Sequence, residues 1–264
     1  MTTITGVNTE GLALNTVHEG DCLELMREIP DGSVDMILCD LPYGTTSNKW
    51  DEIISLESLW EQYTRIVKAR GAVVLTASQP FTTTIISSNQ KGFCYTWVWD
   101  KKFGANFVQA KRQPIKTHED VVVFSKTGKM PNYYPIMIAR EKPITKGGNK
   151  QSQSIPIART KTSEEFGKTK KTYTHKYPTS QITFNVREGR GLHPTQKPVS
   201  LFEYLIRTYT NEGEIILDNC IGSGTTAVAA INTGRQFIGI EKEPEYVAIS
   251  NERIAKARAE VANV

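Results

Sequence analysis

Apolar residues fall into two patterns along the chain, short continuous runs and stretches where they return every three or four positions. Short runs are typical of strands covered on both faces of a sheet. They predict strands at 34–39, 72–76, 95–99, 121–124, 214–217 and 236–240. The helical spacing predicts helices at 56–68, 200–209, 225–232 and 244–259, the first closed by a basic turn ending at Gly71. Alternating strands and helices predict an α/β fold with a doubly wound, mostly parallel sheet.

The middle of the chain breaks this pattern. From about residue 130 to 191 it is rich in Lys, Thr, Ser, Gln and Tyr and has little periodicity, which predicts an inserted module or a long mobile segment outside the sheet. Residues 126–190 contain 14 Lys and Arg against four Glu and no Asp, an excess of ten. Because the net charge is +4, the rest of the chain carries −6. So local an excess favours a polyanionic partner.

The composition bounds the class of protein. Hydrophobic residues make up 39% and charged residues 23%, as in a globular protein. No run approaches the roughly 18 apolar residues of a membrane span, and the first residues do not resemble a secretion signal. The cysteines lie far apart without metal-ligand spacing, which predicts reduced thiols, no metal site and a cytoplasmic location. They are Cys22, Cys39, Cys94 and Cys220.

A glycine-rich turn follows the predicted strand 214–217 and its acidic neighbour Asp218. Glycines let a ligand approach the backbone, and the first N–H groups of the next helix can bind a carboxylate. Glu241, 23 residues after Asp218, ends the next strand and can accept both hydroxyls of a ribose. The alternative is a plain strand-to-helix turn, but the two acidic residues favour a nucleoside-bearing cofactor, and S-adenosylmethionine fits best. The turn residues are Gly222, Ser223, Gly224, Thr225 and Thr226.

A second turn, residues 40–44, follows the predicted strand 34–39. Pro42 holds Leu41 extended, so the Leu41 carbonyl and the Asp40 carboxylate can both accept hydrogen bonds from one planar amine. Tyr43 offers an aromatic face for the ring that carries this amine. Two acceptors free the nitrogen lone pair for attack on a methyl sulfonium group. The alternative is a proline turn with a capping Asp, but together the two turns favour methylation of an amino group.

Several segments resemble the β-class DNA amino-methyltransferases, in which a D-P-P-Y-type motif comes first and an F-x-G-x-G-type motif last. Residues 40–43 match D-P-P-Y with Leu41 in place of the first Pro. Residues 218–226 match D-P-F-x-G-S-G-T-T except at Asn219 and Cys220, and residues 193–198 read H-P-T-Q-K-P as in the family. The resemblance covers about residues 17–249.

The resemblance implies a class I, Rossmann-like methyltransferase fold with circularly permuted motif order and S-adenosylmethionine as cofactor. It implies that Asp21, in the G-D-C segment 20–22, helps hold the cofactor's adenine and that Lys197 lies at its methionine end. Segments 99–101 and 118–124 are expected to line the base pocket; His118 could equally be structural, and Trp97 and Trp99 are expected in the core. Asp rather than Ser at the head of the catalytic motif favours adenine N6.

Double-stranded DNA is the expected partner, because an amino group inside a duplex is reached by flipping the base out. We predict three parts: a catalytic half at 1–125, a basic target-recognition insertion at 126–191 and a cofactor-binding half at 192–264. A homodimer and a cognate restriction endonuclease are further candidate partners. The residues predicted to bind DNA are Lys161, Lys168, Lys170, Lys171, Lys176, Arg187 and Arg190.

Three alternatives to site-specific adenine-N6 methylation stay open. Cytosine-N4 methylation would use the same chemistry. A protein glutamine-amide methyltransferase uses a related turn, but normally has Asn at its head and the cofactor motif first. A non-catalytic DNA-binding relative would keep the fold, but the intact Asp40, Pro42, Tyr43 and Gly222 argue against it.

Overall fold

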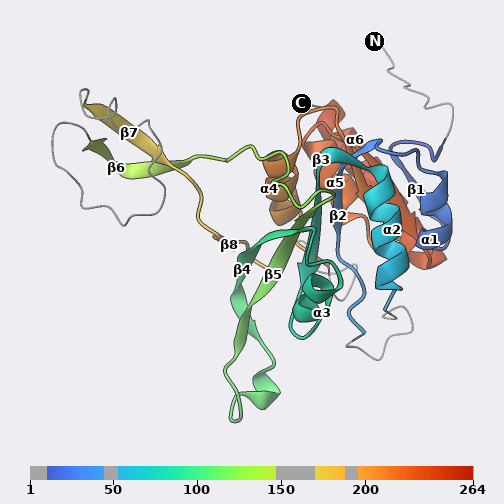
Figure 1. Cartoon of the computed structure of the whole chain (residues 1–264), viewed down its shortest axis with the longest axis horizontal. Coiled ribbons are helices and arrows are strands. Elements are labelled where there is room, and N and C mark those ends of the chain that lie inside the picture. Colours follow the sequence, from blue (N-terminus) through green and yellow to red (C-terminus); the bar gives the residue numbers. More distant parts are fainter. Residues whose placement is uncertain (1–10, 45–52, 147–169, 188–195, 264) are drawn as a thin grey trace. The chain divides into compact units, whose positions relative to one another are not determined.

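The computed structural model describes residues 11–44, 53–146, 170–187 and 196–263. The chain forms two compact units, which we call the sheet unit and the β6–β7 unit (Figure 1). The sheet unit contains Met1–Tyr134 and Ser180–Val264, and the β6–β7 unit contains Pro135–Thr179.

Eight strands of the sheet unit form one sheet in the order β1-β10-β9-β2-β3-β5-β4-β8. Neighbouring strands are parallel except where β5 pairs with β3 and with β4, so the sheet is mostly parallel as predicted. The strands are β1 Thr16–Glu19, β2 Val34–Cys39, β3 Val67–Ala77, β4 Phe93–Ala105, β5 Lys116–Ser125, β8 Gln181–Thr183, β9 Ile215–Asp218 and β10 Gln236–Glu241.

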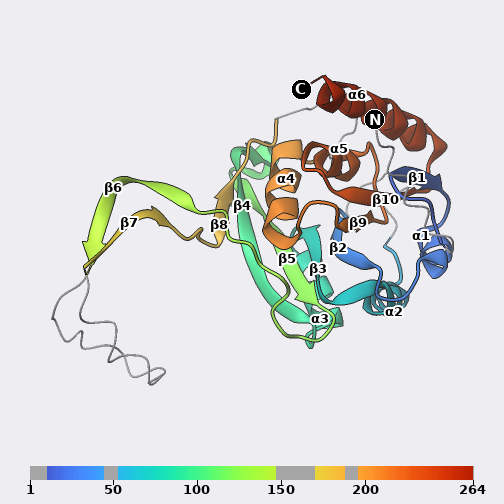
Figure 2. The ribbon, with the colours of Figure 1, turned by 90° about the horizontal axis from the view of Figure 1, so that it is seen from above.

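Helices cover both faces of this sheet (Figure 2). One face carries α4 Val199–Tyr209, α5 Thr225–Asn232 and α6 Pro244–Ala262. The other carries α1 Cys22–Leu25, α2 Leu56–Ile66 and α3 Phe81–Ser88, and two short 3-10 turns lie at Met26–Glu28 and Phe107–Gln109. This doubly wound arrangement confirms the predicted α/β fold.

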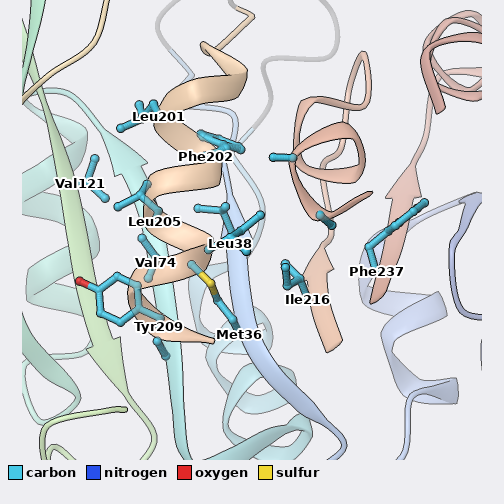
Figure 3. Close-up of a cluster of buried hydrophobic side chains, with 14 of the residues drawn as sticks. Met36, Leu38, Val74, Val121, Leu201, Phe202, Leu205, Tyr209, Ile216 and Phe237 are labelled. Atoms are coloured by element: carbon cyan, nitrogen blue, oxygen red, sulfur yellow. The ribbon is translucent and has the colours of Figure 1, made fainter. Parts of the chain in front are cut away.

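Side chains of β2 alternate between two hydrophobic cores, one on each face. Met36 and Leu38 belong to the core under α4, whereas Ile37 and Cys39 belong to the core under α2. Because both faces are covered, every residue of β2 is buried, which explains its nearly continuous apolar run. Figure 3 shows the α4 side packing against β2, β3 and β5, with α4 residues Leu201, Phe202, Leu205 and Tyr209.

Helix α2 ends earlier than predicted. It stops at Ile66, and Val67 already pairs with Val34 as the first residue of β3. Gly71 therefore lies inside a strand and does not cap a helix. A Cβ at Gly71 would lie 2.7 Å from the Asp35 carbonyl oxygen, so glycine is needed there for the close approach of two strands.

One prediction for the middle segment was wrong, because part of it belongs to the sheet. Strand β8 pairs with β4, and Ile182 and Val186 are buried in the core under α4. A strand of three residues with a single apolar side chain is too short to show periodicity in the sequence. The described residues of the β6–β7 unit form two exposed antiparallel strands, β6 Ile138–Lys146 and β7 Lys171–Lys176. In the part of the chain that the structure describes, no helix is long and apolar enough to cross a membrane.

Candidate active site

The strand order reverses between β2 and β9, which is where open α/β sheets bind ligands. From β2 the chain continues to β3 on one side, and from β9 it continues to β10 on the other. Ile37 pairs with Leu217, so the turn after β2 and the turn after β9 leave the same edge of the sheet as neighbours. The structure thus brings together the two turns that the sequence singled out, although Asp40 and Asp218 are far apart in the chain.

Among the residues that the structure describes, three donors hold the Asp40 carboxylate. The Tyr43 hydroxyl donates to Oδ1 at 2.8 Å, the Thr76 hydroxyl donates to the same oxygen, and Lys197 Nζ donates to Oδ2 at 2.5 Å. A carboxylate has about four acceptor positions, so these contacts leave roughly one on Oδ2. The Asp40 side chain remains 23% exposed. Asp40 is therefore fixed in orientation while keeping an acceptor for a further N–H donor.

Tyr43 is held from two sides rather than standing alone as an aromatic platform. Its ring stacks on Phe81, with centroids 5.0 Å apart and planes inclined by 25°. Lys197 Nζ lies 5.8 Å from the centre of the Tyr43 ring. Burial and the Asp40 charge raise the pKa of Tyr43, which keeps its hydroxyl a neutral donor to Asp40. Thr76 and Phe81 were missed in the sequence; Thr76 had a signal, as a polar residue ending an apolar run.

Lys197 connects Asp40 to two further charged residues. Glu119 accepts a hydrogen bond from Lys101 Nζ at 2.6 Å, and its other oxygen lies 3.9 Å from Lys197 Nζ. Burial disfavours the charged amine, but Asp40 and Glu119 outweigh it and raise the pKa of Lys197. Glu119 Oε2 is buried and has no hydrogen-bond partner among the described residues. The result is a row of alternating charges beside the catalytic turn.

The predictions for residues near the site had different outcomes. Trp97 and Trp99 are buried in the core, as predicted. His118 is exposed, whereas its neighbour Glu119 is partly buried beside the site. Lys197 was expected at the methionine end of the cofactor, which stays a prediction; in the structure its amine donates to Asp40.

Asp218 lies at the start of the glycine turn and is 3% exposed. Its Oδ1 accepts the N–H of Cys220 at 3.0 Å, and its Oδ2 accepts the Thr226 hydroxyl. Burial raises the pKa of Asp218 to about 7, against hydrogen bonds that lower it. Asp218 therefore fixes the turn and the start of α5 and titrates near neutral pH.

Asn219 and Cys220, where the glycine turn departs from the family's motif, both make contacts within the protein. The Asn219 side chain is buried, and its oxygen accepts the Tyr63 hydroxyl at 2.5 Å. The Asn219 amide also donates to the Cys220 sulfur at 3.4 Å. Cys220 packs with the core under α2, so this position keeps an apolar contact without the family's Phe.

The two glycines of the turn have different roles. Both have positive φ, 52° at Gly222 and 84° at Gly224. A Cβ at Gly224 would lie 2.9 Å from Cβ of Ser250, so this glycine allows α6 to pack closely. A Cβ at Gly222 would meet nothing within 4 Å, so Gly222 borders open space. That space is where a ligand can approach the backbone.

Two acidic residues flank this space on neighbouring strands. Glu241, at the end of β10, accepts the N–H groups of Gly222 at 2.7 Å and Glu243 at 2.9 Å, and burial raises its pKa. Asp21 follows β1, whose last residue Glu19 pairs with Glu241. The Asp21 carboxylate caps α1 by accepting N–H groups 2.8 and 3.2 Å away. Asp21, Glu241 and Asp218 thus end three adjacent strands at one edge.

Arg253 of α6 supports the turn and had no signal in the sequence. Its guanidinium donates to the Ser223 carbonyl at 2.5 Å and to the Ser223 hydroxyl at 3.0 Å. The side chains of Thr225 and Thr226 are buried at the start of α5. The turn therefore has a fixed shape before any ligand binds.

The residues predicted to bind DNA divide between the two units. Lys170, Lys171 and Lys176 are exposed in the β6–β7 unit, and Lys171 Nζ lies 5.6 Å from the ring centre of Tyr173. Arg187 belongs to the sheet unit, where its guanidinium lies 3.8 Å from the ring centre of Phe103. The other predicted positions lie outside the described residues: Lys161, Lys168 and Arg190.

Comparison with known proteins identifies the family. A family model for N6 and N4 methyltransferases, described as DNA methylase, matches residues 34–252. The chain is 29% identical to the DNA adenine methyltransferase YhdJ of Escherichia coli K12 over 257 residues, covering 92% of this chain and 84% of that protein. The match spans both turns and the segment between them, so the chain belongs to the DNA methylase family.

Solved structures show the same fold at low identity. The cytosine-N4-specific PvuII DNA methyltransferase aligns with a TM-score of 0.65 and 18% identity, covering 96% of this chain and 94% of that one. The complex of M1.HpyAVI with SAM aligns with a TM-score of 0.60 and 23% identity, covering 90% and 98%. Together, family and fold make this chain a DNA methyltransferase.

Proposed function

We propose that the protein transfers a methyl group from S-adenosylmethionine to the N6 amino group of adenine in DNA. The observation that carries this proposal is the adjacency of the two turns at the point where the strand order reverses. One turn borders open space flanked by carboxylates, and the other presents an oriented carboxylate. A methyl donor and an amine acceptor bound to these turns would lie side by side.

The residues around Gly222 fit S-adenosylmethionine. Glu241 would accept the ribose hydroxyls with the acceptor positions that its two backbone contacts leave free. Asp21 would meet the adenine, and the start of α5 would face the carboxylate of the methionine part. The cofactor supplies a methyl group on positively charged sulfur. The printed title of the similar M1.HpyAVI structure names a complex with SAM, which supports this choice.

Asp40 and the Leu41 carbonyl would accept the two N–H bonds of the amino group, so that its lone pair points at the methyl carbon. Bound S-adenosylmethionine would supply the methyl carbon to this lone pair, and its sulfur would keep the electron pair of the broken carbon–sulfur bond. The nitrogen would carry a positive charge until it released one proton to the Asp40 carboxylate or to water. The Asp40 carboxylate, held by Tyr43, Thr76 and Lys197, stabilises that positive charge without having to reorient.

Adenine is favoured over cytosine by the Asp at the head of the catalytic turn and by the similarity to an adenine methyltransferase. Cytosine-N4 methylation is the second candidate, because a cytosine-N4-specific enzyme shares the fold. We further propose that the basic middle segment recognises the target, between a catalytic part at 1–125 and a cofactor-binding part at 192–264.

Sequencing native genomic DNA from a methylation-deficient host that expresses this chain tests the proposal. We expect N6-methyladenine in one recurring short motif. N4-methylcytosine in such a motif would correct the base, and the absence of both modified bases would refute the proposed activity.

Asp40→Ala should abolish methylation, because it removes the acceptor that orients the amine. The variant should still bind S-adenosylmethionine in a calorimeter, since Asp40 lies outside the glycine turn. Methylation at the wild-type rate would contradict the role given to Asp40.

A further inference from the structure

The end of the β4–β5 hairpin, residues 102–116, projects past the edge of the sheet that carries the candidate site. Strand β3 ends at Ala77, which pairs with Asp120, whereas β5 begins four residues earlier at Lys116. Because Thr76 binds Asp40, this is the edge where the catalytic turn lies. Figure 1 shows the hairpin extending beyond the sheet on the side where β2 ends. We call residues 102–116 the hairpin tip.

The hairpin tip carries a net positive charge. It contains four Lys and Arg residues and no Asp or Glu. Three of them are exposed, and Lys116 binds the Ser78 hydroxyl just past the end of β3. A run of positive charge without a compensating carboxylate matches the phosphates of a duplex. The four residues are Lys102, Lys111, Arg112 and Lys116.

The hairpin tip also exposes large apolar side chains, among them Phe107 and Val108. Val108 is 101% exposed and Phe107 is 55% exposed. Folding gains nothing from a fully exposed Val. Apolar side chains flanked by Lys and Arg are suited to contact bases, where they can enter a gap in the stack. A gap of that kind opens when the target base leaves the duplex.

The base of the tip is held in a defined shape. Asp100 accepts the N–H of Lys102 at 3.0 Å, and Asn106 accepts the N–H of Lys116 at 3.0 Å. Phe103 packs edge-on against Phe107, with centroids 5.7 Å apart, and Arg187 covers Phe103. These contacts hold the base of the tip in place, while residues 107–115 remain exposed.

We propose that the hairpin tip is a DNA-contacting element beside the catalytic turn. Lys111 and Arg112 bind backbone phosphates, and Val108 and Phe107 contact the bases next to the flipped nucleotide. This inference rests on the proposed function and adds a second DNA contact, separate from the β6–β7 unit.

The charge part is tested with Lys111→Glu/Arg112→Glu, using fluorescence anisotropy on a labelled duplex that contains the methylated motif. Loss of two phosphate contacts should weaken binding about tenfold or more at low salt and reduce the salt slope by about two. The matched control is Lys91→Glu/Lys256→Glu, the same charge change at exposed positions away from this edge. Equal binding by the two variants would overturn the proposal, as would a changed oligomeric state of the tip variant with unchanged DNA binding.

The apolar part is tested with Val108→Ala, which cannot disturb the fold because the side chain is fully exposed. We expect the methylation rate to fall about fivefold, with less fluorescence from 2-aminopurine at the target position, because the gap is filled less well. A wild-type methylation rate and wild-type 2-aminopurine fluorescence in this variant would show that Val108 does not contact the DNA. If the wild-type enzyme methylates and both tip variants match it, only this inference fails; if the wild type methylates no DNA, the proposed function fails.

Discussion

Among single residues, Asp40 is where the contacts of the candidate site converge. It receives donors from the following turn, from β3 and from the segment before α4. Of these, the D-P-P-Y-type motif indicated only Tyr43. Thr76 reaches the site through the sheet, and its signal in the sequence was that of a polar residue ending an apolar run. Phe81 reaches the site through α3, and this contact between distant segments leaves no local pattern in a sequence.

Lys197→Met should lower the methylation rate about a hundredfold, because the charge that holds Asp40 Oδ2 is lost. Lys101→Met is the matched control, since Lys101 pairs with Glu119 and not with Asp40. Single-turnover rates at saturating cofactor, together with calorimetry of cofactor binding, measure the effect. Equal rate losses in the two variants would contradict a specific role of Lys197 in holding Asp40.

Asp218 makes the stability of the protein depend on pH. Its pKa rises from 3.8 to about 7, so the folded state binds a proton that the unfolded state has already released. Between these values the folding stability of the wild type therefore falls as the pH rises. Asp218→Asn removes this loss; its side-chain oxygen can still accept the Cys220 N–H, while its NH2 group can donate to the Thr226 hydroxyl.

The melting temperature of Asp218→Asn relative to the wild type should therefore increase from about pH 5 to about pH 8. Scanning calorimetry in the absence of cofactor measures it. A constant difference across this range would show that Asp218 does not titrate there.

Among the elements, the glycine turn contains one glycine that matters for cofactor binding and another that matters for folding stability. Gly222→Ala should fold with only the cost of a left-handed alanine, about 1–2 kcal/mol, because its Cβ points into open space. It should lose most of its affinity for S-adenosylmethionine, because the Cβ fills that space. Gly224→Ala has the same backbone cost, and its Cβ would also collide with Ser250 of α6. It should therefore be the less stable variant.

Urea unfolding and calorimetric titration on the two variants measure these effects. The reverse order of stabilities, or full cofactor affinity in Gly222→Ala, would contradict the roles given to the two glycines.

Elements buried on both faces were predictable, and short or exposed ones were not. The predicted strand at 34–39 coincides with β2, and the helix at 225–232 coincides with α5. The four residues of β1 and the three of β8 are recognised only through their partners β10 and β4. Residues 67–71 were predicted as the end of a helix because Lys68 and Arg70 resemble a basic last turn, but pairing of Val67 with Val34 makes them a strand.

For the whole molecule, replacing Pro135–Thr179 by a flexible linker should separate catalysis from DNA recognition. Both ends of the replaced segment are anchored in the sheet unit, since the Tyr134 N–H donates to the Thr208 carbonyl at 2.7 Å and the Val98 N–H to the Ser180 carbonyl at 2.8 Å. The variant should keep its melting temperature and cofactor affinity while DNA binding weakens and loses part of its salt dependence, because its basic residues are gone.

Anisotropy titrations over a range of salt concentrations, run beside the wild type, test this expectation. A wild-type salt slope in the variant would show that the replaced segment contributes little to phosphate binding.

The pairing of β2 with β9 also determines when the site forms. Met36 pairs with Ile216 across 180 residues of chain, which makes this the sort of contact that closes late in folding. During synthesis the catalytic turn leaves the ribosome long before the glycine turn exists. An incomplete chain therefore carries basic residues suited to DNA but lacks the edge at which donor and acceptor meet, so methylation begins only when the last strands have joined the sheet.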